Sequence, residues 1–320
     1  MSSGGPGRAS EEDQDERECA DGEHGFRLAP RSSQTNKPQL FFWSVAVASL
    51  PGREVTEWTA ALPAVLSSIA TLAAVFAIGA RTWGVGAGAM AALVLASTIG
   101  FFAIGHHGQS DVMVTAWTWW ALYGLLVARR AGYATRPLVA FYACVGGAIL
   151  SKGPIGLVGL AAGFAGVAYS DGWRDTMRLR PVLGLVVLAV LLAPWYGTYL
   201  VGRGSAFVGD TVGGHYGSWV FRRGVRARLE SLWVLAYVLP WTIFLVAAAT
   251  WWRKRPDVER CLIAAWTLTI WVLVGLSGAH RARYLIPIYS GLALLVGEFL
   301  TRAAAHGGAS ALRRARPRKV

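Results

Sequence analysis

The chain has 320 residues, of which 54% are apolar and only 15% are charged, whereas a soluble domain carries about 25% charged residues. Several apolar runs reach the ~20 residues that a helix needs to cross a bilayer, so the composition excludes a soluble fold and predicts an all-α, polytopic transmembrane helical bundle. The net charge of +13 lies mostly in short loops and tails, which is typical of membrane topology and of contact with anionic lipid rather than of nucleic-acid binding.

The first stretch, residues 1–38, is polar and lacks periodic apolar residues, which predicts a disordered N-terminal segment. The apolar segment Leu40–Leu50 follows, and as a helix it would span about 16 Å, which predicts a short interfacial or re-entrant helix. We expect a transmembrane domain over residues 39–303 and a basic cytoplasmic tail over residues 304–320. Nine candidate spans lie in that domain: 57–80, 84–105, 112–128, 136–150, 153–170, 181–202, 231–252, 259–279 and 284–302.

The basic residues of the connections test this order of spans. If the N-terminal end of span 57–80 lies outside, the most basic connections fall inside, as the positive-inside rule requires. These inner residues are Arg81, Arg129, Arg130, Arg136, Arg174, Arg178, Arg180, Arg253, Lys254, Arg255, Arg260 and the arginines of the tail. The C-terminus is therefore predicted to be cytoplasmic.

The outer connections then carry most of the unusual polar groups, which predicts a functional outer face. They are 106–111, 151–153, 203–230 and 280–283. The second of these holds Ser151-Lys152-Gly153 and predicts a tight hairpin. The third contains several arginines against the charge rule, and an anionic ligand is one reason for such an exception.

A polar cluster, His106-His107-Gly108-Gln109-Ser110-Asp111, separates two long apolar stretches. Burying a carboxylate in lipid costs several kcal/mol, so Asp111 is predicted at a bilayer surface or in a water-filled cavity. A solvated helix N-cap would account for an aspartate there equally well.

Seven strings occur in order between residues 36 and 289 and resemble strings of the dolichol-phosphate-mannose protein mannosyltransferase superfamily. This superfamily, glycosyltransferase family 39, has bacterial relatives that act on lipid A. The stretches 36–43, 110–115 and 150–156 resemble "KPPLYYW", "TDMLLTF" and "LTKGPVG". The stretch 281–289 resembles "KRPRYLLPLYP", and the other three strings are 57–63, 193–196 and 239–241.

The resemblance implies a GT-C-type fold of about nine spans, with a catalytic pocket at the outer face of the cell membrane. It implies a glycosyltransferase that moves a sugar from a polyprenyl-phosphate carrier to a lipid or protein acceptor. The expected partners are that donor, the acceptor and the lipid bilayer, and no nucleic acid. No cofactor is certain, and a divalent metal is left open.

In such a transfer a carboxylate takes the proton of the acceptor and cations stabilise the departing phosphate. Asp111 matches the family's acidic residue at the mouth of the pocket and is the candidate base. Lys37 matches the family lysine implicated in contacting the carrier phosphate, and a snorkelling interfacial lysine is the alternative. Lys152 could reach a phosphate from its hairpin or be a solvated turn residue.

Arg281, Arg283 and Tyr284 are the stronger phosphate candidates, because guanidinium groups grip phosphate bidentately and tyrosine adds a hydroxyl donor. An interfacial belt of aromatic and basic residues is the alternative. Four further residues, His215, Tyr216, His106 and His107, could contact substrate or a metal, although a lone histidine is more often structural.

One departure from the family lies at the N-terminus. Family members begin with a transmembrane helix and an outer loop that carries an acidic catalytic pair, whereas no apolar segment precedes Leu40 here. Asp15 and Glu16 faintly echo that pair, and a solvated acidic run is the alternative. The departure favours a second hypothesis, a catalytically inactive or truncated member that binds the lipid carrier or acts as a scaffold. A transporter is less well supported, since the spans lack charged midplane residues and detectable inverted repeats.

Overall fold

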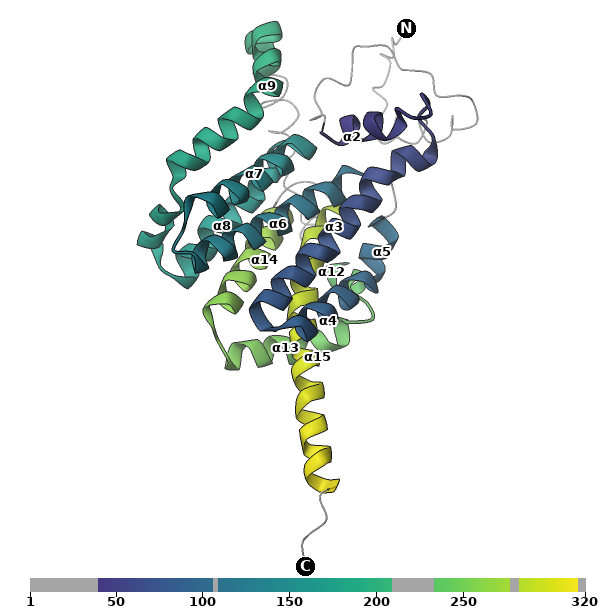
Figure 1. Cartoon of the computed structure of the whole chain (residues 1–320), viewed down its shortest axis with the longest axis vertical. Coiled ribbons are helices and arrows are strands. Elements are labelled where there is room, and N and C mark those ends of the chain that lie inside the picture. Colours follow the sequence, from purple (N-terminus) through teal and green to yellow (C-terminus); the bar gives the residue numbers. More distant parts are fainter. Residues whose placement is uncertain (1–39, 106–108, 209–232, 277–281, 316–320) are drawn as a thin grey trace, which may run out of the picture. The chain divides into compact units, whose positions relative to one another are not determined.

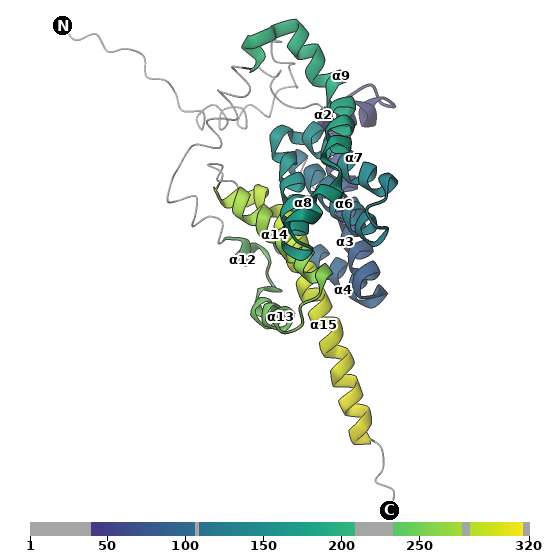
Figure 2. The same ribbon diagram turned by 90° about the vertical axis from the view of Figure 1, so that its left-hand side faces the viewer.

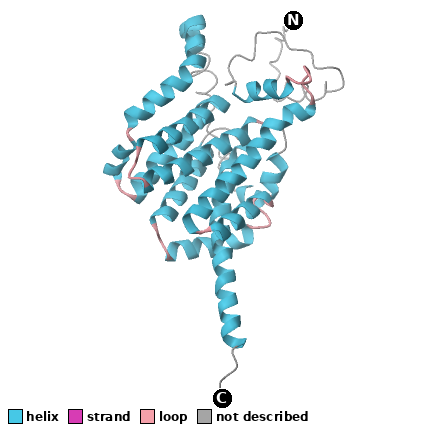
Figure 3. Ribbon diagram, in the orientation of Figure 1, coloured by secondary structure: helices cyan, strands magenta, loops and turns pink. Residues whose placement is uncertain are grey.

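The computed structural model describes residues 40–105, 109–208, 233–276 and 282–315 (Figure 1). Within these ranges every regular element is a helix and no strand occurs, so the all-α prediction is confirmed (Figure 3). Five described helices are long and apolar enough to cross a membrane, and two bent pairs raise that number to seven. The predicted number of nine separate spans is therefore not confirmed.

The first described elements are α2 (Leu40–Ser49) and α3 (Glu57–Trp83), which pack on each other. α2 is the short apolar helix that the sequence predicts at this place. α3 begins at a capping box, in which the Thr56 hydroxyl accepts from the backbone N–H of Thr59 and the Thr59 hydroxyl accepts from the backbone N–H of Thr56. This cap fixes where the first long helix starts.

The predicted span 84–105 is broken into α4 (Val85–Ala96) and α5 (Ile99–Gly105), which are bent by 67°. The Ser97 and Thr98 hydroxyls donate back to the carbonyls of Leu93 and Val94, a bonding pattern that bends helices. Beyond the break, the N–H of Ile99 donates to the carbonyl of Leu239 at 3.1 Å. A backbone group from a distant segment thus stabilises the bend.

α3 and α4 cross at unusually close range. A Cβ atom added at Gly88 would overlap the carbonyl oxygen of Phe76, and one added at Gly79 would lie 2.7 Å from the Cα of Gly88. Small residues at a crossing let two helix backbones approach in lipid, where no hydrophobic effect drives helices together. This crossing is therefore a packing feature of the two helices.

α6 (Ser110–Arg130) is followed by α7 (Thr135–Lys152), the 3₁₀ turn η1 (Gly153–Gly156) and α8 (Leu157–Ser170). The chain reverses at Gly153, whose φ of +82° is a conformation that side chains with a Cβ rarely adopt. The hydroxyl of Tyr133, just before α7, reaches Asp171, just after α8, so the two legs run antiparallel. The predicted hairpin is confirmed.

The next elements are the 3₁₀ helix η2 (Trp173–Leu179), α9 (Pro181–Val208), the short α12 (Val234–Tyr237) and α13 (Thr242–Lys254). The prediction of one span over 231–252 is wrong within the described residues, because the helix stops before Pro240 and restarts at Thr242. Proline has no N–H to continue the helical ladder. α13, with 13 residues, covers only about 20 Å.

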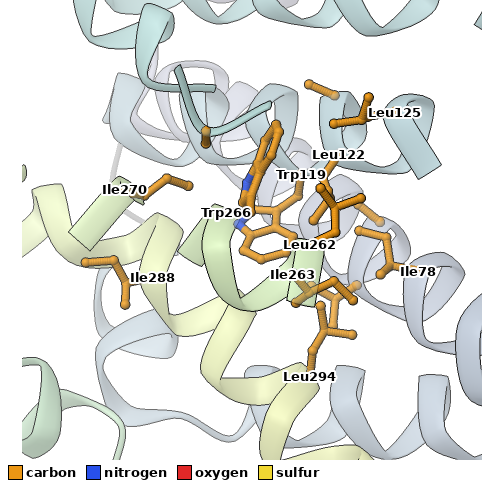
Figure 4. Packing of buried hydrophobic residues seen from close by; sticks show 14 of the residues in the cluster. Ile78, Trp119, Leu122, Leu125, Leu262, Ile263, Trp266, Ile270, Ile288 and Leu294 are labelled. Carbon is orange, nitrogen blue, oxygen red and sulfur yellow. The ribbon is translucent and has the colours of Figure 1, made fainter. Parts of the chain in front are cut away.

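The last elements are α14 (Val258–Leu276), the 3₁₀ turn η5 (Ala282–Leu285) and α15 (Ile286–Ala315). α15 packs against α4, α6, α13 and α14. In Figure 2, α12 and α13 are seen to the left of α15. Figure 4 shows the core where α3, α6, α14 and α15 meet, with Trp119 and Trp266 at its centre. Both tryptophans have no exposed surface. The ends of α6, α7 and η5 are positioned by this packing.

Several helices expose apolar side chains instead of burying them. On α3 these include Leu62, Leu66 and Ile69, which follow one another at helical spacing. A soluble protein rarely exposes a continuous apolar face, whereas a lipid-facing helix must. The exposed faces therefore agree with a multi-pass membrane protein.

Candidate functional site

Asp111 lies in the first turn of α6 and is only 6% exposed. The N-terminus of a helix favours negative charge, which helps to hold a carboxylate there. Its Oδ1 atom accepts a hydrogen bond from Nζ of Lys152, and the two form an ion pair. The carboxylate is therefore part of a built polar group and does not face lipid alone.

Lys152 is the last residue of α7, and the reversal at Gly153 directs the following chain away from it. Its Nζ atom also lies 4.2 Å from the ring centroid of Tyr284, a cation–π distance. The Lys152 side chain is 21% exposed, so its ammonium group is partly desolvated. One cation thus joins the ends of α6, α7 and η5.

Arg283 and Tyr284 belong to η5, which lies far in the sequence from both Asp111 and Lys152. Nε of Arg283 lies 3.7 Å from Oδ2 of Asp111, within range of charge attraction but too far for a hydrogen bond. That Nε atom is buried and has no hydrogen-bond partner among the described residues. A buried donor of this kind is available to an anionic acceptor.

A small cavity of about 20 Å³ lies beside this group, enough for about one water molecule. Its walls are mostly apolar, and apolar surroundings strengthen the interactions of charges at the rim. The lining residues are Asp111, Val114, Thr118, Lys152, Ile155, Val158, Ile270, Val274, Tyr284 and Pro287.

Asp111, Lys152 and Arg283 together carry one negative and two positive charges, an excess of one positive charge. Paired cations in a partly buried site bind phosphate and carboxylate groups well. We call this group, with Tyr284, the outer cluster, because the sequence analysis predicts that the connections around its residues are the outer ones. Its composition suits an anionic ligand that also needs a nearby base.

The structure brings together four of the predicted site residues, Asp111, Lys152, Arg283 and Tyr284, which form the outer cluster. Their chemical roles stay predictions. The other eight predicted residues, Asp15, Glu16, Lys37, His106, His107, His215, Tyr216 and Arg281, lie outside the described residues. Within the described ranges, no group of three or more His, Cys, Asp or Glu residues could hold a metal ion.

The sequence analysis missed Val114, Thr118 and Pro287, which line the cavity. The first two follow Asp111 at i+3 and i+7, so helical spacing alone places them on its face. Pro287 lies one turn after Arg283 and depends on how α15 packs on α6.

A second polar group lies at the opposite end of α6, about 27 Å from Asp111 at 1.5 Å per residue. Arg129 donates two hydrogen bonds of 2.7 Å to Asp171, and the Tyr133 hydroxyl donates a third of 3.0 Å. Arg130 reaches Glu259 and the carbonyl of Arg81. Arg129 and Arg130, which the sequence analysis assigned to inner connections, therefore link this end of α6 to residues of other elements.

Charges have clear effects in this second group, which lies just beyond the spans. The hydrogen bonds from Arg129, followed by that from Tyr133, hold the pKa of Asp171 below its ordinary value. Burial, together with the charge of Asp171, raises the pKa of Tyr133 to about 12. The group is a compact structural network at the end of three helices.

Comparison with known proteins gives consistent matches. Residues 36–197 match the dolichyl-phosphate-mannose-protein mannosyltransferase family. Undecaprenyl phosphate-alpha-4-amino-4-deoxy-L-arabinose arabinosyl transferases from Pectobacterium carotovorum and Pectobacterium atrosepticum are 23% and 22% identical over 228 residues. That match covers 66% of this chain and 40% of each transferase.

The fold is similar to the crystal structures of ArnT from Cupriavidus metallidurans. The TM-score is 0.71 for the form bound to undecaprenyl phosphate and 0.73 for the apo state, at 24% sequence identity. The matches cover 82% and 86% of this chain but 49% and 51% of the solved chain. The chain thus spans about half the length of these relatives, and the predicted GT-C-type fold is confirmed.

Proposed function

The chain belongs to the dolichyl-phosphate-mannose-protein mannosyltransferase family, and from this premise we propose that it is an integral membrane glycosyltransferase. It moves a sugar from a polyprenyl-phosphate carrier to a lipid or protein acceptor. The outer cluster is the reaction site. Undecaprenyl phosphate is the carrier named for the similar arabinosyl transferases and for the ligand of the similar crystal structure.

The observation that carries the proposal is the pairing of one buried carboxylate with two cations. A donor phosphodiester carries one negative charge, which the excess positive charge of the outer cluster offsets. The unpartnered Nε of Arg283 and the Lys152 ammonium group supply donors to the phosphate oxygens. A carboxylate alone would repel the donor.

In the proposed reaction, the acceptor hydroxyl oxygen attacks the anomeric carbon of the sugar. A new carbon–oxygen bond forms, and the bond between that carbon and the phosphate oxygen breaks. The proton of the acceptor passes to the Asp111 carboxylate. The electron pair of the broken bond stays on the carrier phosphate, which gains a negative charge that Lys152 and Arg283 stabilise.

The same arrangement links donor binding to the base. Without a ligand, the Asp111 carboxylate is engaged by Lys152. A phosphate that takes over Lys152 and Arg283 releases the carboxylate to accept a proton. The donor therefore prepares the base for the acceptor.

The outer cluster faces the outer side of the cell membrane in this proposal, and the C-terminus is cytoplasmic. Support comes from the arginine-rich group at the opposite end of α6, because basic residues concentrate on the cytoplasmic side. Cysteine labelling at the exposed Pro154, which follows Lys152 in η1, against labelling at the exposed Arg255 would test the orientation with a reagent that does not cross membranes.

The test of the function is transfer from radiolabelled polyprenyl-phosphate sugars in membranes that contain the chain. The wild type should transfer label, and both Asp111→Ala and Arg283→Ala should reduce transfer. Asp171→Asn is a matched control, because it removes an ion-paired carboxylate at the far end of α6. It should leave transfer unchanged wherever the protein remains folded.

Wild-type transfer that never exceeds an empty-vector control would contradict the proposal. Carrier binding without any turnover would instead favour the inactive, carrier-binding alternative. Equal loss of transfer in Asp171→Asn and Asp111→Ala would show that the outer cluster has no special role.

A further inference from the structure

Trp119 connects α6 to the start of α15. Its side chain has no exposed surface, and its indole N–H donates to the carbonyl oxygen of Pro287 at 2.9 Å. Trp119 follows Asp111 on α6 by about two turns, or ~12 Å. Pro287 follows Arg283 by about one turn. The bond therefore lies directly beneath the outer cluster and joins the two elements that carry Asp111 and Arg283.

The start of α15 is fixed by a small number of specific contacts. Ile286, Ile288 and Tyr289 are fully buried, so the helix cannot shift without repacking the core. A Cβ atom added at Gly291 would overlap the side chain of Thr267 on α14, which shows how closely α14 and α15 approach. Trp119 provides the corresponding tie to α6. Together the two contacts hold α15 from both sides.

The distance between Arg283 and Asp111 depends on this tie. Nε of Arg283 has no hydrogen-bond partner among the described residues and lies 3.7 Å from the carboxylate. No described hydrogen bond within the outer cluster thus sets the place of this guanidinium nitrogen. Its place follows from where η5 and α15 sit relative to α6, and the bond between Trp119 and Pro287 links these two elements directly, in addition to the packing of the buried start of α15.

We propose that Trp119 is a positioning residue that holds Arg283 at the correct distance from Asp111 to grip the carrier phosphate. The inference rests on the proposed function. Trp119 does not line the cavity and touches no reacting atom, so its effect passes through Pro287 and η5.

The core provides a matched control in Trp266, on α14. Trp266 is also fully buried in the same cluster, and Figure 4 labels both tryptophans in this core. Its indole nitrogen has no hydrogen-bond partner among the residues that the structure describes. Trp266→Phe therefore removes the same volume and the same N–H group but no described hydrogen bond.

The experiment measures binding of radiolabelled undecaprenyl phosphate to the purified, detergent-solubilised chain. Trp119→Phe should weaken binding about fivefold, which corresponds to about 1 kcal/mol. Trp266→Phe should change binding by less than about twofold. Because Trp119 acts through Arg283, Trp119→Phe should cause no further loss when added to Arg283→Gln. If Trp119→Phe acted only by weakening the fold, it would weaken binding both in the wild type and in Arg283→Gln.

A second variant keeps the test valid if Trp119→Phe folds poorly. Replacement of Trp119 by β-(3-benzothienyl)alanine keeps the ring shape and removes only the N–H donor. It should reproduce the fivefold loss while the protein remains folded at the assay temperature, which its melting curve checks.

The outcomes separate the two claims. A wild type that does not bind undecaprenyl phosphate overturns the proposed function and this inference with it. If the wild type binds, three results would overturn the positioning role alone. These are normal binding by the benzothienyl variant, an equal loss of binding in Trp266→Phe, and additive losses from Trp119→Phe and Arg283→Gln.

Discussion

Asp111 and Lys152 are 41 positions apart in the chain and form an ion pair where the first turn of α6 meets the last turn of α7. Arg283 adds a second cation at 3.7 Å without a hydrogen bond to the carboxylate. The carboxylate therefore competes with any anionic ligand for the same two cations. Because of this competition, removing the charge of Asp111 should strengthen carrier binding, whereas removing a contact from a simple binding pocket would weaken it.

Asp111→Asn should abolish transfer and strengthen carrier binding. Loss of the base lowers the rate by about 10²-fold to 10⁴-fold. Loss of the competing charge should tighten binding of undecaprenyl phosphate by up to about tenfold, or 1.4 kcal/mol. Equilibrium binding and initial-rate assays on the same preparation measure the two effects. Weaker binding by the variant would mean that Asp111 helps to hold the carrier.

Glu298→Gln should destabilise the protein far more than Glu259→Gln. Glu298 has no exposed side-chain surface and is paired with Arg260 at 2.5 Å, so its neutralisation removes the buried one of the two carboxylates that pair with this cation. Asp257 still pairs with Arg260 at 2.6 Å, so the cost stays below the roughly 3–5 kcal/mol of a fully broken buried pair. Glu259 is 24% exposed and pairs with the 36% exposed Arg130, a contact worth less than about 1 kcal/mol. Thermal unfolding in detergent compares the variants, and equal shifts would contradict the prediction.

Tyr133→Phe should make stability less sensitive to alkaline pH. Burial raises the pKa of Tyr133 to about 12, above the ordinary value of 10.0, so the folded state favours the protonated phenol. This contribution is fully present below pH 10 and is lost as the pH rises from 10 towards 12. The melting temperature of the wild type should fall more steeply over this range than that of the variant. Parallel curves would show that the pKa of Tyr133 is the same in the folded and unfolded states.

Gly88→Ala should separate α3 from α4. The new Cβ would overlap the backbone of Phe76 and Ala80, and such overpacking costs about 1–3 kcal/mol. Gly86→Ala on the same helix is the control, because its Cβ would meet only the Thr301 side chain at 3.6 Å. The control should be neutral or slightly stabilising, since alanine favours helix over glycine. Melting temperatures of the two variants decide between these results.

The sequence predicts local features of this fold well. The turn at Gly153 follows from the break between two apolar runs, and the ends of α6 follow from the polar residues around Asp111 and Arg130. The convergence of Asp111, Lys152 and Arg283 follows from the alternation of spans, because all three lie in connections on the same side. The lengths of the apolar runs and the charges of the loops are sufficient to predict these local features, without any knowledge of how the helices pack.

Other features depend on contacts between distant segments. The break after α4 lies at Ser97 and Thr98, two small polar residues that do not by themselves predict a bend, and the bond between Ile99 and Leu239 that stabilises it joins distant segments. The bond from Trp119 to Pro287 joins residues 168 positions apart. The break at Pro240 does not follow from the missing N–H alone, because Pro63 and Pro194 lie inside the continuous helices α3 and α9.

The hairpin of α7 and α8 is closed at both ends, by Gly153 at one and by the bond between Tyr133 and Asp171 at the other. One residue inserted into α7 would rotate everything beyond it by about 100° and swing the Lys152 ammonium away from the carboxylate. Homologues that keep this chemistry should therefore show no length variation between residues 133 and 152. Insertions and deletions in the lineage should accumulate instead in segments that are not pinned at both ends.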